Sequence, residues 1–142
     1  MKCIFKNVEI KSIATCLPEK VVEMTGYKDI FGEKVVEETI SGSGIERLHE
    51  AAIGETTADL CQCAAELIFE KENYNRDLID GLVFVSQTFD YYMPATACVL
   101  QGRLGLSKDC VCFDISFGCS GYINGIFQPA SLISSGAWNH VA

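Results

Sequence analysis

The sequence is poor in basic residues and histidine, and it has no long apolar run. Its 142 residues include 11 Lys and Arg, scattered along the chain, against 19 Asp and Glu, so the net charge is −8. Nucleic-acid phosphates are bound by clustered Lys and Arg, so this composition argues against a nucleic-acid partner. Residues 1–20 lack the unbroken apolar stretch of a secretion signal or a membrane span. We therefore expect no membrane partner and a cytoplasmic location.

Cysteine, in contrast, is abundant, with eight residues. A chain of this length that is 49% hydrophobic can bury a core without covalent staples, so we expect free thiols. Cys61 and Cys63 would diverge on a helix, whereas Cys110 and Cys112 would share one face of a strand. The C-x-C spacing and the lack of a nearby histidine make these pairs weak metal candidates, and we favour small core residues. No metal and no cofactor is expected.

Strand-like runs alternate with helix-like stretches, which is typical of an α/β fold with βαβ units and a largely parallel sheet. The chain stops at "GAWNHVA", residues 136–142, where a further strand ought to begin. No linker or repeat marks an internal boundary, so we expect residues 1–142 to be one domain, or part of one, of a truncated protein. The predicted strands are residues 7–15, 81–88 and 110–115.

The predicted helices are recognised by their ends. Thr56 and Asp59 form a capping-box pattern ahead of apolar residues at helical spacing. Pro94 suits the first position of the next helix, and Gly105 is a natural stop. Pro129 should kink or interrupt the last helix. The predicted helices are residues 56–71, 94–105 and 120–135, after a loosely helical, acidic stretch that ends near residue 38.

Cys119 lies in "FDISFGCSGY", residues 113–122, between an apolar run and the beginning of a helix. Unpaired N–H groups and the positive end of the helix dipole favour the thiolate there. The flanking Gly118 and Gly121 would leave room for a substrate, and N–H groups at such a turn can donate to an oxyanion. The position indicates a nucleophile for acyl transfer. The alternative is that Cys119 is one more buried thiol.

Three ordered motifs carry a family resemblance: "SGSGIER" at 41–47, "YYMPATACVLQGRLGL" at 91–106 and "FDISFGCSGY" at 113–122. Together they resemble the β-ketoacyl-acyl carrier protein synthase III family of the thiolase fold, over nearly the whole chain from about Val8. The resemblance implies a thiolase-like N-terminal domain, incomplete here, with a mixed, largely parallel sheet and covering helices. The family's nucleophile motif is matched by Phe113, Asp114, Cys119, Gly121 and Tyr122.

The resemblance implies an acyltransferase that works in two steps. Cys119 would take the acyl group of a primer thioester, and malonyl-acyl carrier protein would then decarboxylate and attack the acyl-cysteine. The product would be a β-ketoacyl thioester, as in the initiation of fatty acid synthesis, and the enzyme would be a homodimer. Family members add a His and an Asn from the C-terminal half, so this chain alone is expected not to complete the condensation. His140 and His49 are expected to be solvated surface residues.

The resemblance also implies substrate-binding roles for Gly44, Arg47 and Met93, and it leaves the acyl donor open between coenzyme A and acyl carrier protein. The family's adenine-stacking Trp and its nucleotide-binding Arg fall at Glu38 and Gly42, which cannot do either job. The motif's threonine is also replaced, by Ser43.

Met93 stands where the family has a Phe that reaches across the dimer interface and limits acyl length. Methionine is longer and more adaptable, so we expect a pocket tolerant of longer or branched primers. The alternative is that Met93 fills a gap in the core.

Two other functions stay open. A non-catalytic ketosynthase-like subunit could pair with an active partner, although the retained cysteine speaks against this. A related condensing enzyme could make a specialised acyl product, such as 3-hydroxy-3-methylglutaryl-coenzyme A. That chemistry requires a Glu near the cysteine, and residues 75–95 offer only Asp77, Asp80 and Asp90.

Overall fold

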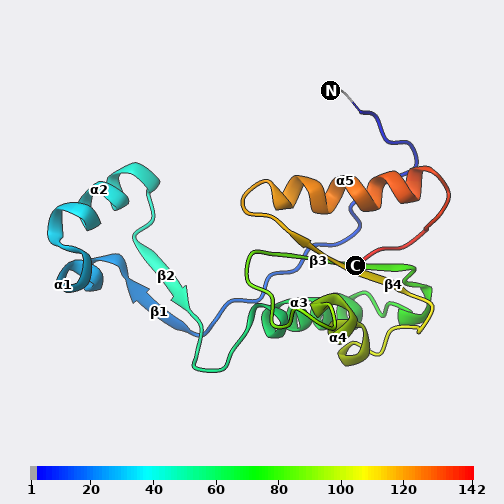
Figure 1. Ribbon diagram of the computed structural model, residues 1–142, viewed down its shortest axis with the longest axis horizontal. Coiled ribbons are helices and arrows are strands. Elements are labelled where there is room, and N and C mark those ends of the chain that lie inside the picture. The colour runs from blue at the N-terminus through cyan, green and yellow to red at the C-terminus, as the bar shows by residue number, and fades with distance from the viewer. Residues whose placement is uncertain (1–2) are drawn as a thin grey trace. The chain divides into compact units, whose positions relative to one another are not determined.

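The structure is a computed structural model that describes residues 3–142 (Figure 1). The chain forms two compact units, which are described one at a time. The smaller unit comprises residues 17–56, and the larger one comprises the residues up to Cys16 together with residues 57–142. Within the described part of the chain, no helix is both long and apolar enough to cross a membrane.

The larger unit is built on two parallel strands, β3 (Gly81–Ser86) and β4 (Val111–Ser116). They pair in register from Gly81 with Val111 to Ser86 with Ser116. Both strands lie within two residues of their predicted bounds, and the prediction of a parallel pair is confirmed.

The last residues form an isolated bridge beside β3. Val141 forms a parallel bridge with Gly81, and the N–H of Ala142 donates to the carbonyl of Gly81 at 3.0 Å. This bridge lies in the segment where the sequence predicts that a further strand begins.

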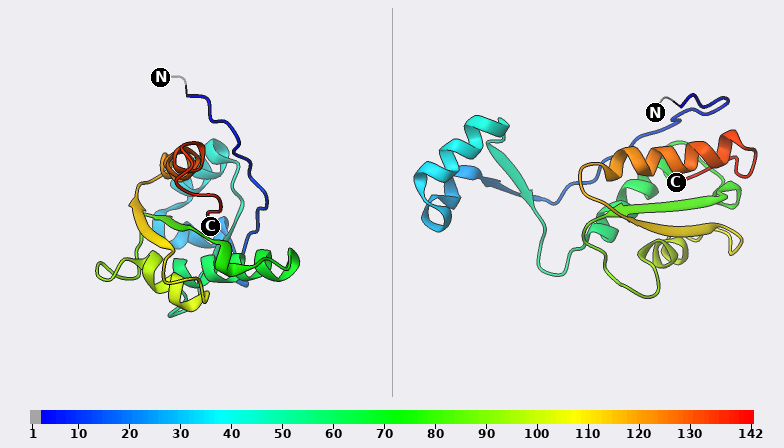
Figure 2. Two further views of the ribbon diagram at one scale, coloured as in Figure 1. Left: turned by 90° about the vertical axis from the view of Figure 1, so that its right-hand side faces the viewer. Right: turned by 45° about the horizontal axis from the view of Figure 1, so that its top comes forward.

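Helices cover both faces of this sheet (Figures 1 and 2). α3 (Thr57–Lys71) and α4 (Thr96–Arg103) lie on one face, and α5 (Gly121–Ser134) lies on the other. α3 matches its predicted bounds. The core lies between the sheet and the α3 and α4 pair, where apolar side chains are removed from water. Its buried members are Ala58, Phe69, Ile79, Leu82, Phe84, Ala97, Leu100, Leu104, Leu106 and Cys110.

Two predictions about the larger unit are wrong, and a third, that Pro129 kinks or interrupts the last helix, fails as far as an interruption is concerned. Residues 7–15 form no strand, because no described segment pairs with their backbone. α4 begins at Thr96, two residues after Pro94, at the point where a carboxylate from β4 binds its first N–H groups. Pro129 does not interrupt α5. It is buried there, so packing outweighs the loss of one helical hydrogen bond.

Cys16 and Cys63 are joined by a disulfide, which contradicts the expectation that all the thiols are free. The extended N-terminal segment places Cys16 against α3, so the two Cα atoms lie 6.1 Å apart although the residues are 47 positions apart in sequence. The bond closes a loop that contains the whole smaller unit. The other six cysteines are free.

The smaller unit is a hairpin with short helices. β1 (Lys20–Glu23) pairs antiparallel with β2 (Arg47–Glu50) in a sheet of its own, separate from the parallel pair of β3 and β4. Between them lie the 3-10 helix η1 (Met24–Tyr27), α1 (Lys28–Phe31) and α2 (Glu33–Ser43). The prediction of a helical stretch is thus confirmed. The stretch is preceded by strand β1, and its last helix, α2, ends five residues after position 38. Lys28 binds Glu33 at 2.8 Å and Glu37 at 3.1 Å, which ties α1 to α2.

Candidate active site

Cys119 lies in the turn between β4 and α5, at the carboxyl edge of the parallel strands. The N–H of Gly121 donates to the carbonyl of Gly118 at 2.7 Å and closes the turn. Cys119 is exposed, so it is not a buried core thiol. Within the described residues, the N–H groups of Cys119 and Ser120 have no hydrogen-bond partner. The turn therefore presents a thiol next to two unused donors.

The sequence suggested that Gly118 and Gly121 leave open space for a substrate. In the structure, the space beside both glycines is occupied. A Cβ atom added to Gly121 would lie 2.8 Å from Cγ1 of Val85, so this glycine lets α5 approach β3 closely. A Cβ atom added to Gly118 would lie 2.5 Å from Nε2 of Gln87. The space beside Gly118 is therefore occupied by a side-chain amide.

Sequence reasoning missed Gln87. It directly follows β3, and the register that pairs Ser86 with Ser116 brings it to the same sheet edge as the Cys119 turn. Gln87 falls inside the strand predicted at residues 81–88, so its only signal in the sequence was a polar side chain near the carboxyl end of a buried strand. Ligands of α/β sheets bind outside these ends. Gln87 is exposed, and its side chain forms no hydrogen bond with any other described residue.

A network of hydroxyl groups fixes the backbone on either side of Gln87. The N–H of Thr88 donates to Oγ of Ser86 at 2.9 Å, and the Ser86 hydroxyl donates to the carbonyl of Thr88 at 3.0 Å. The hydroxyl of Thr88 lies 3.0 Å from that of Thr57, the first residue of α3. These bonds hold the turn after β3 rigid while the Gln87 side chain stays free.

Asp114 links β4 to α4. Its carboxylate accepts the N–H of Thr96 at 2.7 Å and the N–H of Ala97 at 2.8 Å. The N-cap residue of α4 is Ala95, which has no side chain able to cap, so the carboxylate from β4 does this instead. Asp114 therefore fixes α4 to β4. Met93 lies shortly before α4 in the chain, and Cys119 lies shortly after β4.

Met93 is 88% exposed and the neighbouring Tyr92 is fully exposed. Met93 therefore does not fill a gap in the core of this chain. The Met93–Pro94 peptide bond is cis. Met93 and Cys119 both belong to the larger unit.

Gly44 and Arg47 belong to the smaller unit. Gly44 has φ 71° and ends α2, with its N–H donated to the carbonyl of Ile40 at 2.8 Å, so helix termination already accounts for this glycine. Arg47 is exposed on β2 and forms no ion pair within the described chain. Glu38 and Gly42 lie one turn apart on α2, and Glu38 faces Lys34 at 3.8 Å.

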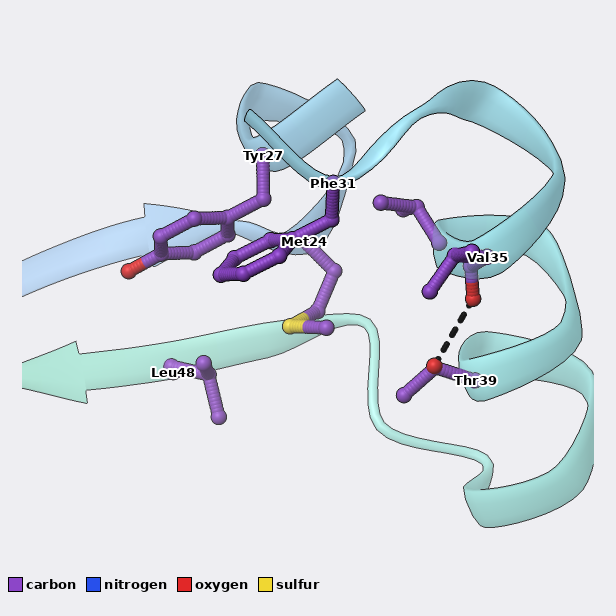
Figure 3. Close-up of a pocket in the computed structure, with 7 residues that line it drawn as sticks. Met24, Tyr27, Phe31, Val35, Thr39 and Leu48 are labelled. Atoms are coloured by element: carbon purple, nitrogen blue, oxygen red, sulfur yellow. Dashed lines mark hydrogen bonds between the residues drawn. The ribbon is translucent and has the colours of Figure 1, made fainter. Parts of the chain in front are cut away.

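The smaller unit contains an apolar cavity of about 410 Å³ (Figure 3). The hydroxyl of Thr39 donates its hydrogen to the carbonyl of Val35 at 2.8 Å, so this hydrogen is already used within α2. No charged side chain lines the cavity, so it suits an apolar group better than a phosphate. The lining residues are Met24, Tyr27, Phe31, Val35, Val36, Thr39 and Leu48.

Cys110 and Cys112 share a strand face, as predicted, with their sulfur atoms 3.8 Å apart. Burial, and after it the neighbouring Cys110, raises the pKa of Cys112 to about 12. No cluster of three metal-ligating side chains occurs in residues 3–142. Cys110 is buried in the core and Cys112 packs against it, which favours the interpretation as small core residues.

The two histidines form specific contacts. Nδ1 of His140 lies 2.6 Å from the hydroxyl of Tyr74, and the His140 side chain is half-buried, so the prediction of a solvated loop residue is wrong. Asp80 holds the backbone N–H groups of Asn139 and His140, which positions the ring. His49 is exposed, and its Nδ1 lies 2.6 Å from the carbonyl of Pro18.

Comparison with known proteins gives a consistent set of relatives, although no family model matches the chain. The β-ketoacyl-[acyl-carrier-protein] synthase III of Ruegeria pomeroyi is 35% identical over 131 residues, which cover 89% of this chain and 39% of that protein. A 3-oxoacyl-[acyl-carrier-protein] synthase 3 of Campylobacter jejuni is 31% identical over 96% of this chain and 39% of its own length. The chain thus spans about two fifths of the length of these relatives.

Solved structures agree with the sequence relatives. A 3-oxoacyl-(acyl-carrier protein) synthase from Burkholderia xenovorans is 36% identical, with a TM-score of 0.83 over 91% of this chain and 38% of that one. OleA from Xanthomonas campestris, at 24% identity over 93% of this chain and 42% of that one, has a TM-score of 0.79 and shares the fold.

Proposed function

Because the chain belongs to the β-ketoacyl-acyl carrier protein synthase III family of thiolase-like condensing enzymes, we propose that it is an acyltransferase whose nucleophile is Cys119. The observation that carries this proposal is the exposed thiol at the carboxyl edge of the sheet, next to the unused N–H groups of Cys119 and Ser120.

The first step is transfer of an acyl group to sulfur. The Cys119 thiolate attacks the carbonyl carbon of an acyl thioester, and a new carbon–sulfur bond forms while the carbonyl oxygen becomes an oxyanion. The N–H of Cys119 donates to that oxygen. When the intermediate collapses, the original carbon–sulfur bond breaks, and the donor thiolate leaves and takes up the proton released by Cys119.

The second step is condensation in the complete enzyme. Malonyl-acyl carrier protein loses carbon dioxide, and its carbanion attacks the acyl-cysteine to release a β-ketoacyl thioester. In the family resemblance, the His and Asn that assist this step belong to a C-terminal half. The residues of this chain therefore bear mainly on the acylation step. The proposal also includes that the enzyme is a homodimer and acts in the cytoplasm.

We assign the selection of the acyl primer to Met93 and the binding of the acyl donor to Gly44 and Arg47. Met93, which is exposed on the segment before α4, would contact the acyl chain, and its flexible thioether suits longer or branched primers. Gly44 and Arg47 would contact the donor. Glu38 and Gly42 offer neither an aromatic surface nor a cation for a nucleotide, so the proposal allows acyl carrier protein as well as coenzyme A to present the primer.

The test is the intact mass of the purified chain after exposure to a panel of acyl-coenzyme A and acyl carrier protein thioesters. We expect one acyl group per chain, mapped to the peptide that contains Cys119. Cys119→Ser should remove the adduct. Cys98→Ser, at an exposed cysteine on α4, is the matched control and should keep it. An unmodified chain with every donor would contradict the proposal and favour a non-catalytic subunit.

A further inference from the structure

Gln87 is the polar side chain that the structure places against the nucleophile turn. The register of β3 and β4 ends with Ser86 beside Ser116, so the residues that follow the two strands are neighbours at one sheet edge. The Gln87 amide nitrogen lies where a Cβ atom of Gly118 would be, within 2.5 Å of that position. Gly118 is the residue directly before Cys119. Any larger side chain at this position would force the Gln87 amide to move.

The chemistry of the side chain matches the need of the acylation step. A primary amide has two N–H donors, and the Gln87 side chain gives none of them to a partner among residues 3–142. Ser86 and Thr88 fix its backbone through the bond of 2.9 Å between the Thr88 N–H and the Ser86 hydroxyl. A donor next to a developing oxyanion stabilises the transition state, and the fixed backbone limits the reorganisation to the Gln87 side chain itself.

We propose that Gln87 is a catalytic residue of the acylation step, in which its amide N–H donates to the carbonyl oxygen of the thioester that Cys119 attacks. The assignment rests on the acyl-transfer function proposed above. As the sulfur–carbon bond forms, the carbonyl oxygen gains negative charge, and the amide shares that oxygen with the N–H of Cys119. When the donor thiolate leaves, the oxygen returns to a carbonyl and the amide is unchanged.

A second glutamine provides a matched control. Nε2 of Gln101, on α4, donates to the carbonyl of Ser107 at 2.7 Å and to the carbonyl of Cys110 at 3.1 Å. Its amide donors are used at the other end of the sheet, where β4 begins. Gln101→Met therefore removes the same chemical group without touching the nucleophile turn.

The experiment compares two reactions of Cys119 in the full chain. Acylation by a thioester creates an oxyanion, whereas alkylation by iodoacetamide displaces iodide at a saturated carbon and creates none. The rate of each is measured at Cys119 by peptide mapping in the parent chain and in Gln87→Met, Gln87→Glu and Gln101→Met. Division of the acylation rate by the alkylation rate cancels changes in thiol reactivity and access.

We expect Gln87→Met to lower this ratio by about tenfold or more, somewhat less than the loss of a fully enclosed oxyanion donor, because the site is exposed. Gln87→Glu should lower it at least as far, since a carboxylate repels the oxyanion. Gln101→Met should keep the parent ratio.

Two outcomes would overturn the assignment, and they differ from each other. If the parent chain is acylated and Gln87→Met keeps the parent ratio, Gln87 has no role while acyl transfer at Cys119 stands. If the parent chain is alkylated at Cys119 but acylated by no donor, the acyltransferase proposal fails, and the role of Gln87 fails with it.

Discussion

At the beginning of β4, Cys110 and Cys112 face the α3 and α4 side of the sheet, whereas the turn after the strand exposes Cys119. The same side chain therefore meets opposite surroundings within ten residues. Burial raises the pKa of Cys112 to about 12 and keeps its sulfur protonated, while Cys119 lies in water next to unused N–H groups. The comparison teaches that reactivity here depends on which end of a parallel strand carries the thiol.

The largest effect is expected in alkylation. Near neutral pH, iodoacetamide should modify Cys112 roughly 10²–10³-fold more slowly in the folded chain than in the chain unfolded by urea, because the raised pKa reduces its thiolate fraction. Cys119 is exposed and should react at a similar rate in both states. Timed samples analysed by peptide mapping give both rates. Equal protection of Cys112 and Cys119 would break the comparison.

Asp114 lies on β4 between Cys112 and Cys119, and its carboxylate binds the first turn of α4. Asp114→Asn removes at least one of two charge-assisted bonds to α4, so the free energy of unfolding should fall by about 2 kcal/mol in urea denaturation. The exposed Tyr92, before α4, should also be cut faster by chymotrypsin.

Asp80→Asn is the matched control, because the Asp80 carboxylate also accepts two backbone N–H groups, at the other edge of the sheet. It should cost stability and leave cleavage at Tyr92 unchanged. If both variants accelerate that cleavage equally, Asp114 has no local effect on the Met93 segment.

A third variant disturbs the Cys119 end alone. A Cβ atom at Gly125 on α5 would lie 2.7 Å from Cγ2 of Val85, so Gly125→Ala should destabilise the chain by about 1–3 kcal/mol through overpacking. Gly102→Ala, on α4, meets nothing within 4 Å and should stabilise by about 0.5–1 kcal/mol. Thermal and urea unfolding measure both.

Gly125→Ala should change the alkylation rate of Cys119 and leave that of Cys112 as it is, because α5 packs on the face of the sheet opposite to Cys112. A change at both cysteines would show that the two ends of β4 are coupled.

A further effect is expected in the alkaline pH dependence of stability. The pKa of Cys112 is higher in the folded state than its ordinary value of 9.0, so the unfolded thiol ionises first. The free energy of unfolding should therefore fall as pH rises above 9.0 towards about 12. Cys112→Ala should reduce this alkaline loss, and Cys98→Ala should not. Urea unfolding at several alkaline pH values compares the slopes, and an unchanged slope in Cys112→Ala would contradict the assignment.

Local patterns predicted the elements of the larger unit well. The apolar, β-branched run before Ser86 and the capping box at Thr56 each depend on neighbours in sequence, so β3 and α3 were found within about two residues. Residues 7–15 alternate like a strand but have no partner among the described residues. A strand is defined by backbone pairing with another segment, which alternation alone does not provide.

The site was predicted only in part. Cys119 was selected because its signal is local, a cysteine between a strand and a helix, and its role as nucleophile stays a prediction. Gln87 lies beside Gly118, which is 31 positions away, and Asp114 binds the first turn of α4, which is 17 or 18 positions away. Such contacts follow from strand register and helix placement, so inspection of each segment by itself could not assign them.

The sequence by itself determined the α/β alternation and the family, and it singled out Cys119 as the candidate nucleophile, because each depends on residue order along a short stretch. Tertiary structure alone decided that Cys16 meets Cys63, that Asp114 caps α4, and that Gln87 fills the space beside Gly118. The physical reason is that bonds and contacts require two groups at the same place, and only the folded chain brings distant residues together.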